Sequence, residues 1–321
     1  MFQYRFHPAK AVSFDGSTLT IDDERARRTV SLAKFNITPQ GLLSAMAAPG
    51  EAQPEVRRLL HEFLVRGLIV EHHPELSTDA RLSRSQGYLA TLCNDPQRAQ
   101  QRISNQRVLV LGVGGTGTVV IQHLVAAGVR DFVLLDHDKV ELSNFNRQFL
   151  WRSSEVGASK LERTATWIEE RAGNPAVTTI EQLITSGDDV AQLLLDHPDV
   201  TVVASCIDTP AGAERLVVDA ALRQGKPVMT GAVGVEFGHV GPLFIPEHRP
   251  CLACWYPETA AGSGVTPWSH GVTNTLIGAL MAQRILEWVV DPTLVRQPAR
   301  MTLEFGSLDV KSTPAPDCGH A

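Results

Sequence analysis

Apolar and polar positions in the first 75 residues follow the pattern of a small module that mixes strands and helices. Phe2–Phe6 alternates apolar and polar residues, which predicts a short strand with one exposed face. Thr38-Pro39 and Pro54 each open a stretch with apolar residues at helical spacing, so helices are expected there. Leu68-Ile69-Val70 predicts a closing strand. This order predicts a winged-helix-like α+β module over residues 1–75.

From residue 106 onward the pattern changes to buried strands that alternate with helices. Val108–Leu111 and Phe132–Leu135 are continuous apolar runs, as in strands of a parallel sheet covered on both faces. A glycine-rich loop and a helical stretch at residues 118–127 separate them, and Val200–Ala204 predicts a further strand. This β-α-β order predicts an α/β, Rossmann-like domain over residues 106–321.

Composition excludes several classes of protein. Hydrophobic residues make up 43% and charged residues 20% of the chain, which is typical of a soluble globular protein. The sequence has no apolar run long enough to span a membrane and no signal-peptide core at its start, so a cytoplasmic location without a membrane partner is expected. The net charge of −6, and the 11 basic and 10 acidic residues of segment 1–90, argue against a nucleic-acid partner.

A glycine-rich loop follows the first buried strand of the larger domain. Gly112, Gly114, Gly115 and Gly117 let the backbone turn tightly and approach a phosphate, and the following helix start offers N–H groups to an anion. Asp136 ends the next strand, 19 residues after Gly117, where a carboxylate can accept hydrogen bonds from a ribose. A dinucleotide and ATP fit these features equally well, and a glycine turn without a ligand is the remaining alternative.

The segment after this strand discriminates between the two nucleotides. It supplies a second carboxylate, two amides and two cations beside the glycine loop: Asp138, Asn144, Arg147, Gln148 and Lys160. Amides and fixed cations suit a triphosphate and a developing negative charge, whereas a nicotinamide domain needs only the first acid. The sequence therefore favours ATP.

Five motifs in this order resemble the ThiF/MoeB/ubiquitin-activating superfamily over about residues 81–320. They are the glycine loop, Asp136-x-Asp138, Ser143-Asn144-x-x-Arg147-Gln148, Val156-Gly157-x-x-Lys160 and Cys206-Ile207-Asp208. The resemblance implies an ATP-dependent adenylating enzyme. It places Asp136 on the ribose, Arg147 and Lys160 on the phosphates, and Asp208 on Mg²⁺. The glycines, Asp138, Asn144 and Gln148 complete the implied ATP site.

Residues 76–105 are polar and rich in Arg and Gln, and we expect a connecting arm with helical stretches. Within it, Arg81-Leu82-Ser83-Arg84 resembles the Arg-x-x-Arg element of the same superfamily. That resemblance implies that Arg84 reaches the ATP of a partner subunit, in a homodimer with an arginine finger in trans. A solvated linker charge is the alternative for Arg84.

The sequence has five cysteines, and an odd count without a signal-peptide pattern is a poor disulfide framework, so the pair Cys251 and Cys254 fits a metal or redox element better. Cys251 and Cys254 form a Cys-x-x-Cys pair, and Cys318 and His320 lie near the end of the sequence. Superfamily members often bind structural zinc through two such pairs, but here the second pair is broken. Zinc is expected to be held by Cys251, Cys254 and Cys318, with His320, two residues after Cys318, as the available fourth ligand. A cysteine pair without metal is the alternative. Cys206, on a predicted buried strand, is expected to be structural.

The segment Trp255–His270 contains no cysteine, whereas relatives that capture the adenylate as a thioester place one there. The N-terminal module resembles the leader-recognition element of enzymes that modify ribosomally made peptides, which adds a peptide strand to its sheet edge. Together these features resemble the microcin-C-type and pantocin-type peptide-modifying members of the superfamily. The resemblance implies adenylation of a carboxylate in a precursor peptide, followed by intramolecular capture, in the biosynthesis of a peptide antibiotic.

Two other hypotheses fit part of the sequence. An adenylyltransferase for a ubiquitin-like sulfur-carrier protein would use the same ATP site. An NAD-sensing winged-helix repressor would have the same domain order, but it leaves Asn144, Arg147, Gln148 and the cysteine pair unexplained.

Overall fold

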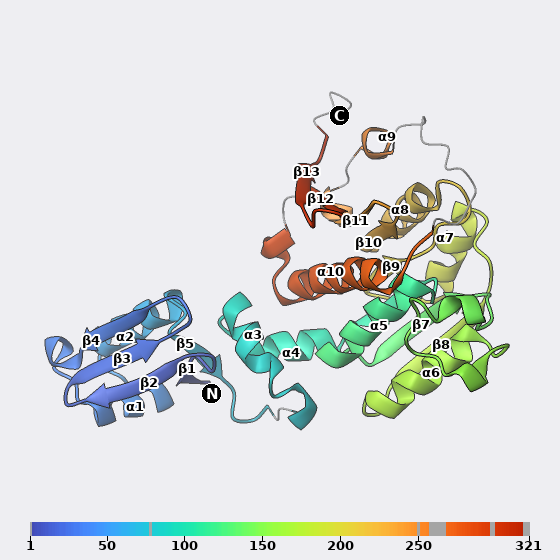
Figure 1. Cartoon of the computed structure of the whole chain (residues 1–321). Coiled ribbons are helices and arrows are strands. Elements are labelled where there is room, and N and C mark those ends of the chain that lie inside the picture. Colours follow the sequence, from blue (N-terminus) through green and yellow to red (C-terminus); the bar gives the residue numbers. More distant parts are fainter. Residues whose placement is uncertain (1, 77–78, 249–250, 257–267, 296–298, 317–321) are drawn as a thin grey trace. The chain divides into compact units, whose positions relative to one another are not determined.

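The computed structural model describes residues 2–76, 79–248, 251–256, 268–295 and 299–316. The chain divides into two compact units, Met1–Ile103 and Ser104–Ala321 (Figure 1). Each unit has its own hydrophobic core. Among the described helices, none has the length and apolar character that crossing a membrane requires.

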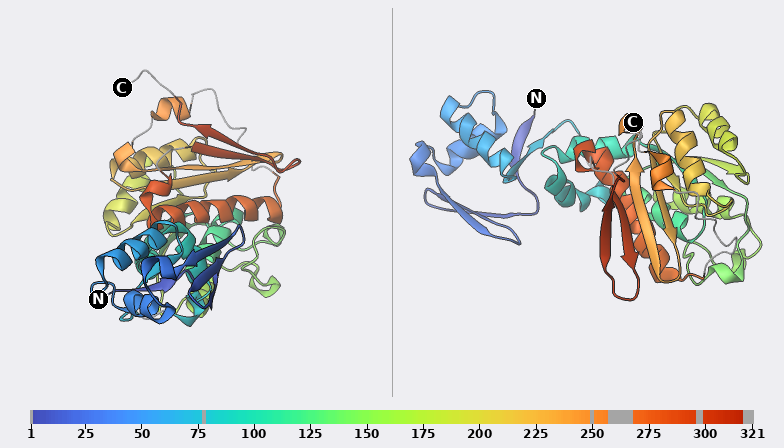
Figure 2. Two further views of the ribbon diagram at one scale, coloured as in Figure 1. Left: turned by 90° about the vertical axis from the view of Figure 1, so that its left-hand side faces the viewer. Right: turned by 90° about the horizontal axis from the view of Figure 1, so that it is seen from above.

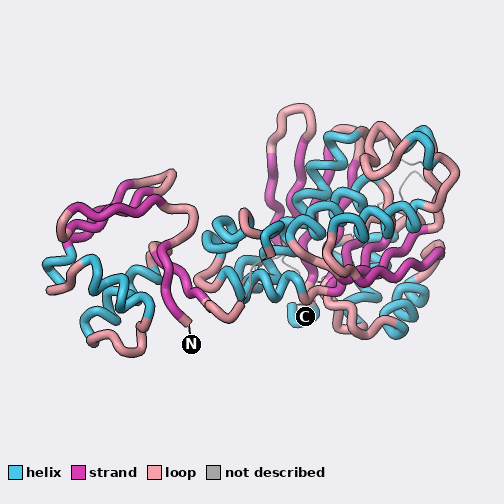
Figure 3. Tube along the Cα trace, turned by 90° about the horizontal axis from the view of Figure 1, so that it is seen from below, coloured by secondary structure: helices cyan, strands magenta, loops and turns pink. Residues whose placement is uncertain are grey.

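The first unit combines a three-stranded antiparallel meander, a two-stranded ribbon and helices. Strands β2, β3 and β4 pair in that order, and β1 pairs with β5. Leu19 and Ile21 of β3 are fully buried and contribute to one core with α1 and α2. They lie on the same face of the strand because alternate side chains point the same way. Figure 3 shows the strands of this unit in magenta and its helices in cyan. The elements are β1 (Gln3–Phe6), β2 (Ala11–Asp15), β3 (Thr18–Asp22), β4 (Arg27–Ser31), η1 (Leu32–Phe35), α1 (Pro39–Ala47), α2 (Pro54–Val65) and β5 (Ile69–His72).

The segment expected to form a connecting arm falls, up to residue 103, within the first unit. It carries η2 (Ala80–Leu82), α3 (Ser85–Leu92) and α4 (Pro96–Ser104). Gln97 of α4 holds the chain just after β5, because its Oε1 accepts from the N–H of His73 at 2.7 Å and its Nε2 donates to the carbonyl of His73 at 3.2 Å. These hydrogen bonds tie α4 to the end of β5.

The second unit is built on an eight-stranded sheet in the order β13-β12-β11-β10-β9-β6-β7-β8. The strands from β8 to β10 run parallel, and the pairs from β10 to β13 are antiparallel. Strands β6, β7 and β9 confirm the predicted buried strands, and the predicted α/β Rossmann-like fold class is confirmed. The strands are β6 (Arg107–Leu111), β7 (Asp131–Asp136), β8 (Ala176–Glu181), β9 (Val202–Ser205), β10 (Val228–Val233), β11 (Phe237–Phe244), β12 (Ala299–Glu304) and β13 (Val310–Pro314).

Helices cover both faces of this sheet. Helices α5 and α10 pack together along one face with α6 beside α5, and α7 and α8 pack together on the other (Figures 1 and 2). The α-helices are α5 (Gly115–Ala127), α6 (Lys160–Arg171), α7 (Gly187–Asp196), α8 (Ala213–Arg223), α9 (Leu252–Trp255) and α10 (Gly271–Val290). The short 3₁₀ turns are η3 (Leu142–Asn144), η4 (Ser153–Glu155), η5 (Pro246–His248) and η6 (Pro292–Val295).

The order of the strands determines where a ligand can bind. After β6 the chain crosses to β7 through α5 on one face, whereas the neighbouring strand β9 continues into α8 on the opposite face. The chain thus leaves the carboxyl ends of β6 and β9 toward opposite faces of the sheet, and open α/β sheets bind ligands at such a switch point. The glycine loop follows β6, and Asp208 follows β9.

Candidate nucleotide site

Two glycines of the loop after β6 are required by close backbone contacts. A Cβ atom on Gly117 would lie 1.9 Å from the carbonyl oxygen of Gly112. Gly112 itself has a φ of +88°, and a Cβ there would lie 2.9 Å from the carbonyl oxygen of Cys206, just after β9. Neither position can hold a side chain unless backbone moves, so these glycines set the path from β6 into α5.

The start of α5 points its N–H groups into this loop. Gly114 is the N-cap, and the first helical hydrogen bond runs from the N–H of Thr118 to the carbonyl of Gly114 at 3.0 Å. The N–H groups of Gly115, Thr116 and Gly117 precede that bond, so they have no acceptor within the helix. The positive end of the helix dipole lies in the same place. A helix start of this kind is a binding site for a phosphate.

Asp136, at the end of β7, is buried and fixes the entrance to the loop. Its Oδ2 accepts from the N–H of Val113 at 2.6 Å, and its Oδ1 accepts from the N–H groups of His137 and Asp138 at 2.7 and 2.8 Å. A carboxylate has roughly four acceptor positions, so these contacts leave about one for a ribose hydroxyl. The residue expected to bind a ribose is therefore also a structural clamp on the glycine loop.

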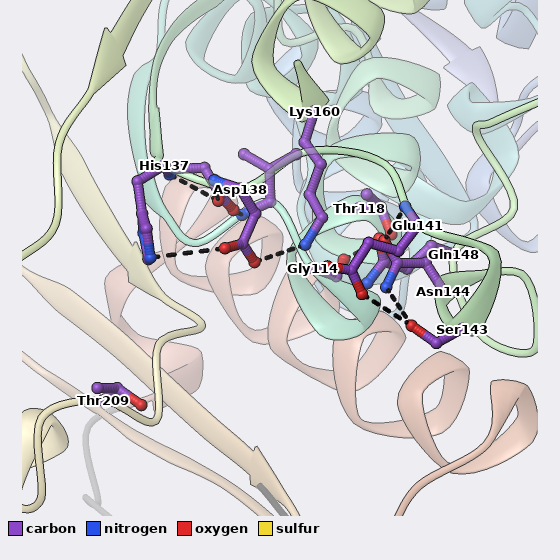
Figure 4. A network of polar contacts seen from close by, with 12 residues as sticks. Gly114, Thr118, His137, Asp138, Glu141, Ser143, Asn144, Gln148, Lys160 and Thr209 are labelled. Atoms are coloured by element: carbon purple, nitrogen blue, oxygen red, sulfur yellow. Dashed lines mark hydrogen bonds and ion pairs between the residues drawn. The ribbon is translucent and has the colours of Figure 1, made fainter. Parts of the chain in front are cut away.

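Asp138 and Lys160 form an ion pair at 2.7 Å, although they belong to separate motifs. Lys160 is buried at the first position of α6, while Asp138 is 52% exposed. Figure 4 shows the Lys160 side chain and the His137 ring both pointing at the Asp138 carboxylate. The atoms of Asp136, His137 and Asp138 that could bind a metal ion lie within 4.8 Å of one another. The two carboxylates already have other partners, because Asp136 accepts from backbone N–H groups and Asp138 pairs with Lys160.

The two predicted amide side chains are buried in the loop that follows β7. Asn144 accepts from the N–H of Glu141 at 3.0 Å and thereby caps the short turn η3. Gln148 accepts from the indole N–H of Trp151 at 2.9 Å through Oε1, so its NH₂ group is the end that faces Gly114 (Figure 4). A Cβ on Gly114 would lie 3.8 Å from that nitrogen. Gln148 therefore offers a donor directly beside the helix start.

Arg147 lies against the same helix start by its aliphatic stem. Its Cγ is 3.2 Å from the position that a Cβ of Gly115 would occupy. Its Nη1 donates to the carbonyl of Ser143 at 2.9 Å and to Oδ1 of Asn146 at 2.8 Å. These contacts place a half-buried cation next to the loop and hold it within its own turn.

Asp208 lies on the neighbouring loop and is exposed. The loop starts beside the glycine loop, because the N–H of Cys206 donates to the carbonyl of Leu111 at 2.8 Å. Figure 4 shows Thr209, the next residue, on this separate loop after β9. Burial raises the pKa of the Cys206 thiol to about 12, so this thiol is neutral at physiological pH and is unsuited to act as a nucleophile.

Asn274 of α10 is not singled out by any sequence pattern, yet its side chain lies against the glycine loop. Its Oδ1 accepts from the hydroxyl of Thr116 at 3.2 Å, and its Nδ2 donates to the carbonyl of His270 at 2.9 Å. A Cβ on Gly115 would lie 2.3 Å from Oδ1. The one signal in the sequence is Gly278, which lies four residues further along α10 and lets this helix approach α5.

The remaining predicted residues lie elsewhere or beyond the described part of the chain. Arg84 is the N-cap of α3 in the first unit, and its side chain is exposed. Cys251 is the N-cap of α9 and Cys254 lies in the same helical turn, so one turn carries both thiols. Cys318 and His320 fall outside the described residues.

The described site groups a helix start with its N–H groups, an amide donor, two cations and carboxylates from two loops. Donors and cations of this kind bind and neutralise phosphate oxygens. The exposed carboxylate of Asp208 is an oxygen donor of the kind that Mg²⁺ prefers. The arrangement can therefore hold a nucleoside triphosphate at the switch point of the sheet.

Comparisons with known proteins agree with this geometry. A model of the ThiF family matches residues 88–319. Adenylyltransferase and sulfurtransferase uba4 of Ogataea parapolymorpha is 32% identical over 191 residues, which cover 59% of this chain and 48% of that protein. Sulfur carrier protein adenylyltransferase of Thermus thermophilus is 32% identical over 196 residues, which cover 59% of this chain and 70% of that protein.

Among solved structures, E. coli MccB with ATP has a TM-score of 0.76 at 20% identity, covering 100% of this chain and 99% of that chain. The microcin C7 biosynthetic enzyme MccB in complex with N-formylated MccA has a TM-score of 0.75, again at 20% identity, covering 99% of each chain. At this identity the likeness shows a shared fold. The chain spans about half the length of the uba4 relative.

Gly117→Ala tests the close approach of Gly117 to the carbonyl oxygen of Gly112. Because the added methyl group would meet a backbone oxygen rather than a movable side chain, we expect the affinity for Mg·ATP to fall at least about tenfold. Isothermal titration calorimetry measures this affinity. All five tryptophans lie in the second unit, so their fluorescence reports whether that unit is still folded.

Gly306→Ala is the matched control, since a Cβ there has nothing within 4 Å. Unchanged affinity in a folded Gly117→Ala protein would contradict the importance of this contact.

Proposed function

The chain belongs to the ThiF family, and on that premise we propose that it is an ATP-dependent adenylyltransferase that activates a carboxylate as its acyl-adenylate. The observation that carries the proposal is the glycine loop, which leads into a helix start with three N–H groups beside the amide of Gln148. The names of the matched curated relatives, both adenylyltransferases, support the same activity.

The chemistry follows from the leaving group. A carboxylate is a poor acyl donor because its leaving group would be oxide. When one of its oxygens attacks the α-phosphorus of ATP, a new phosphorus–oxygen bond forms, the bond to the β-phosphate breaks, and pyrophosphate leaves. The acyl group then carries AMP, which a nucleophile can displace. The attacking carboxylate is already ionised at neutral pH, so the first step needs no general base.

The positions of the site residues support the roles that we propose for them. The start of α5 and the amide of Gln148 bind phosphate oxygens, and Arg147 and Lys160 neutralise charge on them. Asp136 uses its remaining acceptor position for the ribose. Mg²⁺, when bound, supplies further neutralisation of the phosphates, and Asp208 is the residue that we assign to it.

The substrate that we favour is a carboxylate in a ribosomally made precursor peptide. The first unit offers the edge strands β2 and β4 of its meander, to which an extended peptide can add as a further strand. The absence of a cysteine from Trp255 to His270 in the sequence fits capture of the adenylate by a group of the peptide itself. MccB, whose fold this chain shares, is a microcin C7 biosynthetic enzyme and has been solved in complex with N-formylated MccA. This likeness supports a peptide antibiotic as the product.

An adenylyltransferase for a sulfur-carrier protein is the second candidate. The name of the Thermus thermophilus relative favours it directly. The third hypothesis, an NAD-sensing repressor, is disfavoured because the ThiF family match includes the glycine loop.

Zinc and a second subunit complete the proposal. Cys251 and Cys254 present two thiols from one helical turn, which suits a tetrahedral thiolate site, and Cys318 with His320 would supply the other two ligands. When bound, zinc supplies structural cross-linking of the chain.

Arg84 is assigned to the ATP of the partner subunit in a homodimer.

Pyrophosphate exchange into ATP tests the activity and the substrate together. We expect exchange that depends on a cognate precursor peptide, and we expect Asp208→Ala to abolish it because charge on the phosphates is then less well neutralised. Asp219→Ala, which removes a surface carboxylate of α8, serves as the control. Exchange stimulated by a sulfur-carrier protein and not by peptide would transfer the proposal to the second candidate. Full exchange in Asp208→Ala would remove the assigned role of Asp208.

Mixing two inactive variants tests the arginine finger in trans. Arg84→Ala and Asp208→Ala should each be inactive alone. After subunit exchange, a heterodimer contains one site with an intact Asp208 and an intact Arg84 from the partner, so activity should return to about a quarter of the wild-type value. A mixture that stays inactive although mass spectrometry shows heterodimers would place Arg84 in cis or outside the site.

A further inference from the structure

The first turn of α8 contains a carboxylate with an unusually complete set of partners. Oε1 of Glu214 accepts from the hydroxyls of Thr230 and Tyr256 at 2.7 and 2.8 Å and from Nη2 of Arg300 at 3.2 Å. Oε2 lies 3.1 Å from Nε2 of His239. These partners come from β10, β11, β12 and the chain just after α9. One carboxylate thus joins four separate parts of the second unit to α8.

Glu214 stays charged in this setting. Burial alone would raise the pKa of its carboxyl, but the hydrogen bond and charge of His239, the charge of Arg300 and the hydrogen bond of Thr230 outweigh this and lower the pKa to about 2. The side chain is 24% exposed. Since the carboxylate accepts from charged and neutral donors at once, it forms a strong cross-link at neutral pH.

The segment that carries Cys251 and Cys254 is attached to the same turn of α8. Tyr256 is held through its hydroxyl by Glu214, and its carbonyl accepts from Nη1 of Arg215 at 3.4 Å. Trp255 is buried, with its ring edge-to-face on Phe244 at 6.0 Å. The guanidinium of Arg300 lies 5.3 Å from the ring centres of both Trp255 and Tyr256. The cysteine segment is therefore docked on α8 through Tyr256 and on the sheet through Trp255.

The same turn of α8 ends the loop that carries Asp208. At its β9 end the loop is fixed by the hydrogen bond from the N–H of Cys206 to Leu111. At its α8 end the N–H of Ala213 donates to the carbonyl of Pro210 at 2.8 Å. Asp208 lies between these two attachments and is exposed. Its position therefore depends on where the first turn of α8 is held.

We propose that Glu214 is a positioning residue that fixes the Asp208 loop by anchoring the first turn of α8 to the sheet and to the Cys251–Tyr256 segment. Tyr256 of the Cys251–Tyr256 segment donates to Glu214, so this segment helps to fix the loop that contains Asp208. The anchoring itself is independent of the reaction. Its effect on catalysis rests on the proposed function, in which Asp208 acts on Mg·ATP.

Hydrogen–deuterium exchange of the full-length protein measures the anchoring directly. Tyr256→Phe removes one hydroxyl and keeps the ring, and Glu214→Gln removes the charge and keeps the shape. We expect both variants to speed amide exchange in the peptide that spans residues 206–216 by about fivefold, as for loss of one hydrogen bond. Glu287→Gln is the control, because it removes the charge of a part-buried ion pair with Arg284 on α10.

The Mg²⁺ dependence of pyrophosphate exchange gives a second measurement. In Tyr256→Phe the Mg²⁺ concentration for half-maximal rate should rise by about fivefold, while the peptide KM stays unchanged. If Tyr256 had a purely structural role, Tyr256→Phe would lower the amount of folded enzyme. It would then change neither the Mg²⁺ concentration for half-maximal rate nor the peptide KM.

Unchanged exchange of residues 206–216 in folded Tyr256→Phe, or an equal acceleration in Glu287→Gln, would overturn the proposal. Tyr256→Phe decides the outcome if Glu214→Gln does not fold. If wild-type enzyme shows no pyrophosphate exchange, the proposed function fails, while the deuterium experiment still decides whether Glu214 anchors the loop.

Discussion

Helix α5 can start where it does only because Gly117 carries no side chain, and the geometry of the whole site depends on this contact. Its Cα packs so closely on the carbonyl of Gly112 that a Cβ would lie 1.9 Å from the oxygen. The contact places three backbone N–H groups at the switch point of the sheet between β6 and β9. It also brings the loop close enough to β7 for Asp136 to accept from the N–H of Val113. Positive potential at the helix start is thus produced by backbone geometry before any cationic side chain contributes.

The charged side chains around this start are held by the chain itself. Lys160 is paired with Asp138, and Arg147 is held by Ser143 and Asn146 within its own turn. Such contacts fix the positions of the cations, so little reorganisation is needed when charge develops on a phosphate. On the neighbouring loop after β9, the exposed carboxylate of Asp208 lies between two ends that are fixed by hydrogen bonds. The positive groups of the site therefore come from the segments that follow β6 and β7, and the proposed Mg²⁺ ligand comes from the loop that follows β9.

The parts of this structure that follow from local sequence could be predicted. Strand β6 is an unbroken apolar run because both faces of the sheet are covered, and the glycine loop is contiguous in sequence. Strand β13 could not be predicted, since all its residues are exposed and it has no apolar face to produce a pattern. Asn274 is separated from Thr116 by 158 positions, and its role appears only when α10 packs on α5. Glu214 is similar, because its four partners meet only after the antiparallel strands join the sheet. The structural role of Asp136 could not be predicted from the sequence either. Its carboxylate oxygens accept from backbone N–H groups, which no side-chain motif reveals.

An oxygen-isotope experiment tests the central claim, that a carboxylate of the substrate attacks the α-phosphorus of ATP. Wild-type enzyme is incubated with Mg·ATP and a substrate peptide whose carboxylates carry ¹⁸O, and the AMP released is analysed by mass spectrometry. Attack by the carboxylate leaves its oxygen on phosphorus when the acyl group is transferred, so AMP should contain one ¹⁸O atom together with unlabelled pyrophosphate. AMP without ¹⁸O, or ADP and phosphate in place of AMP and pyrophosphate, would contradict the account.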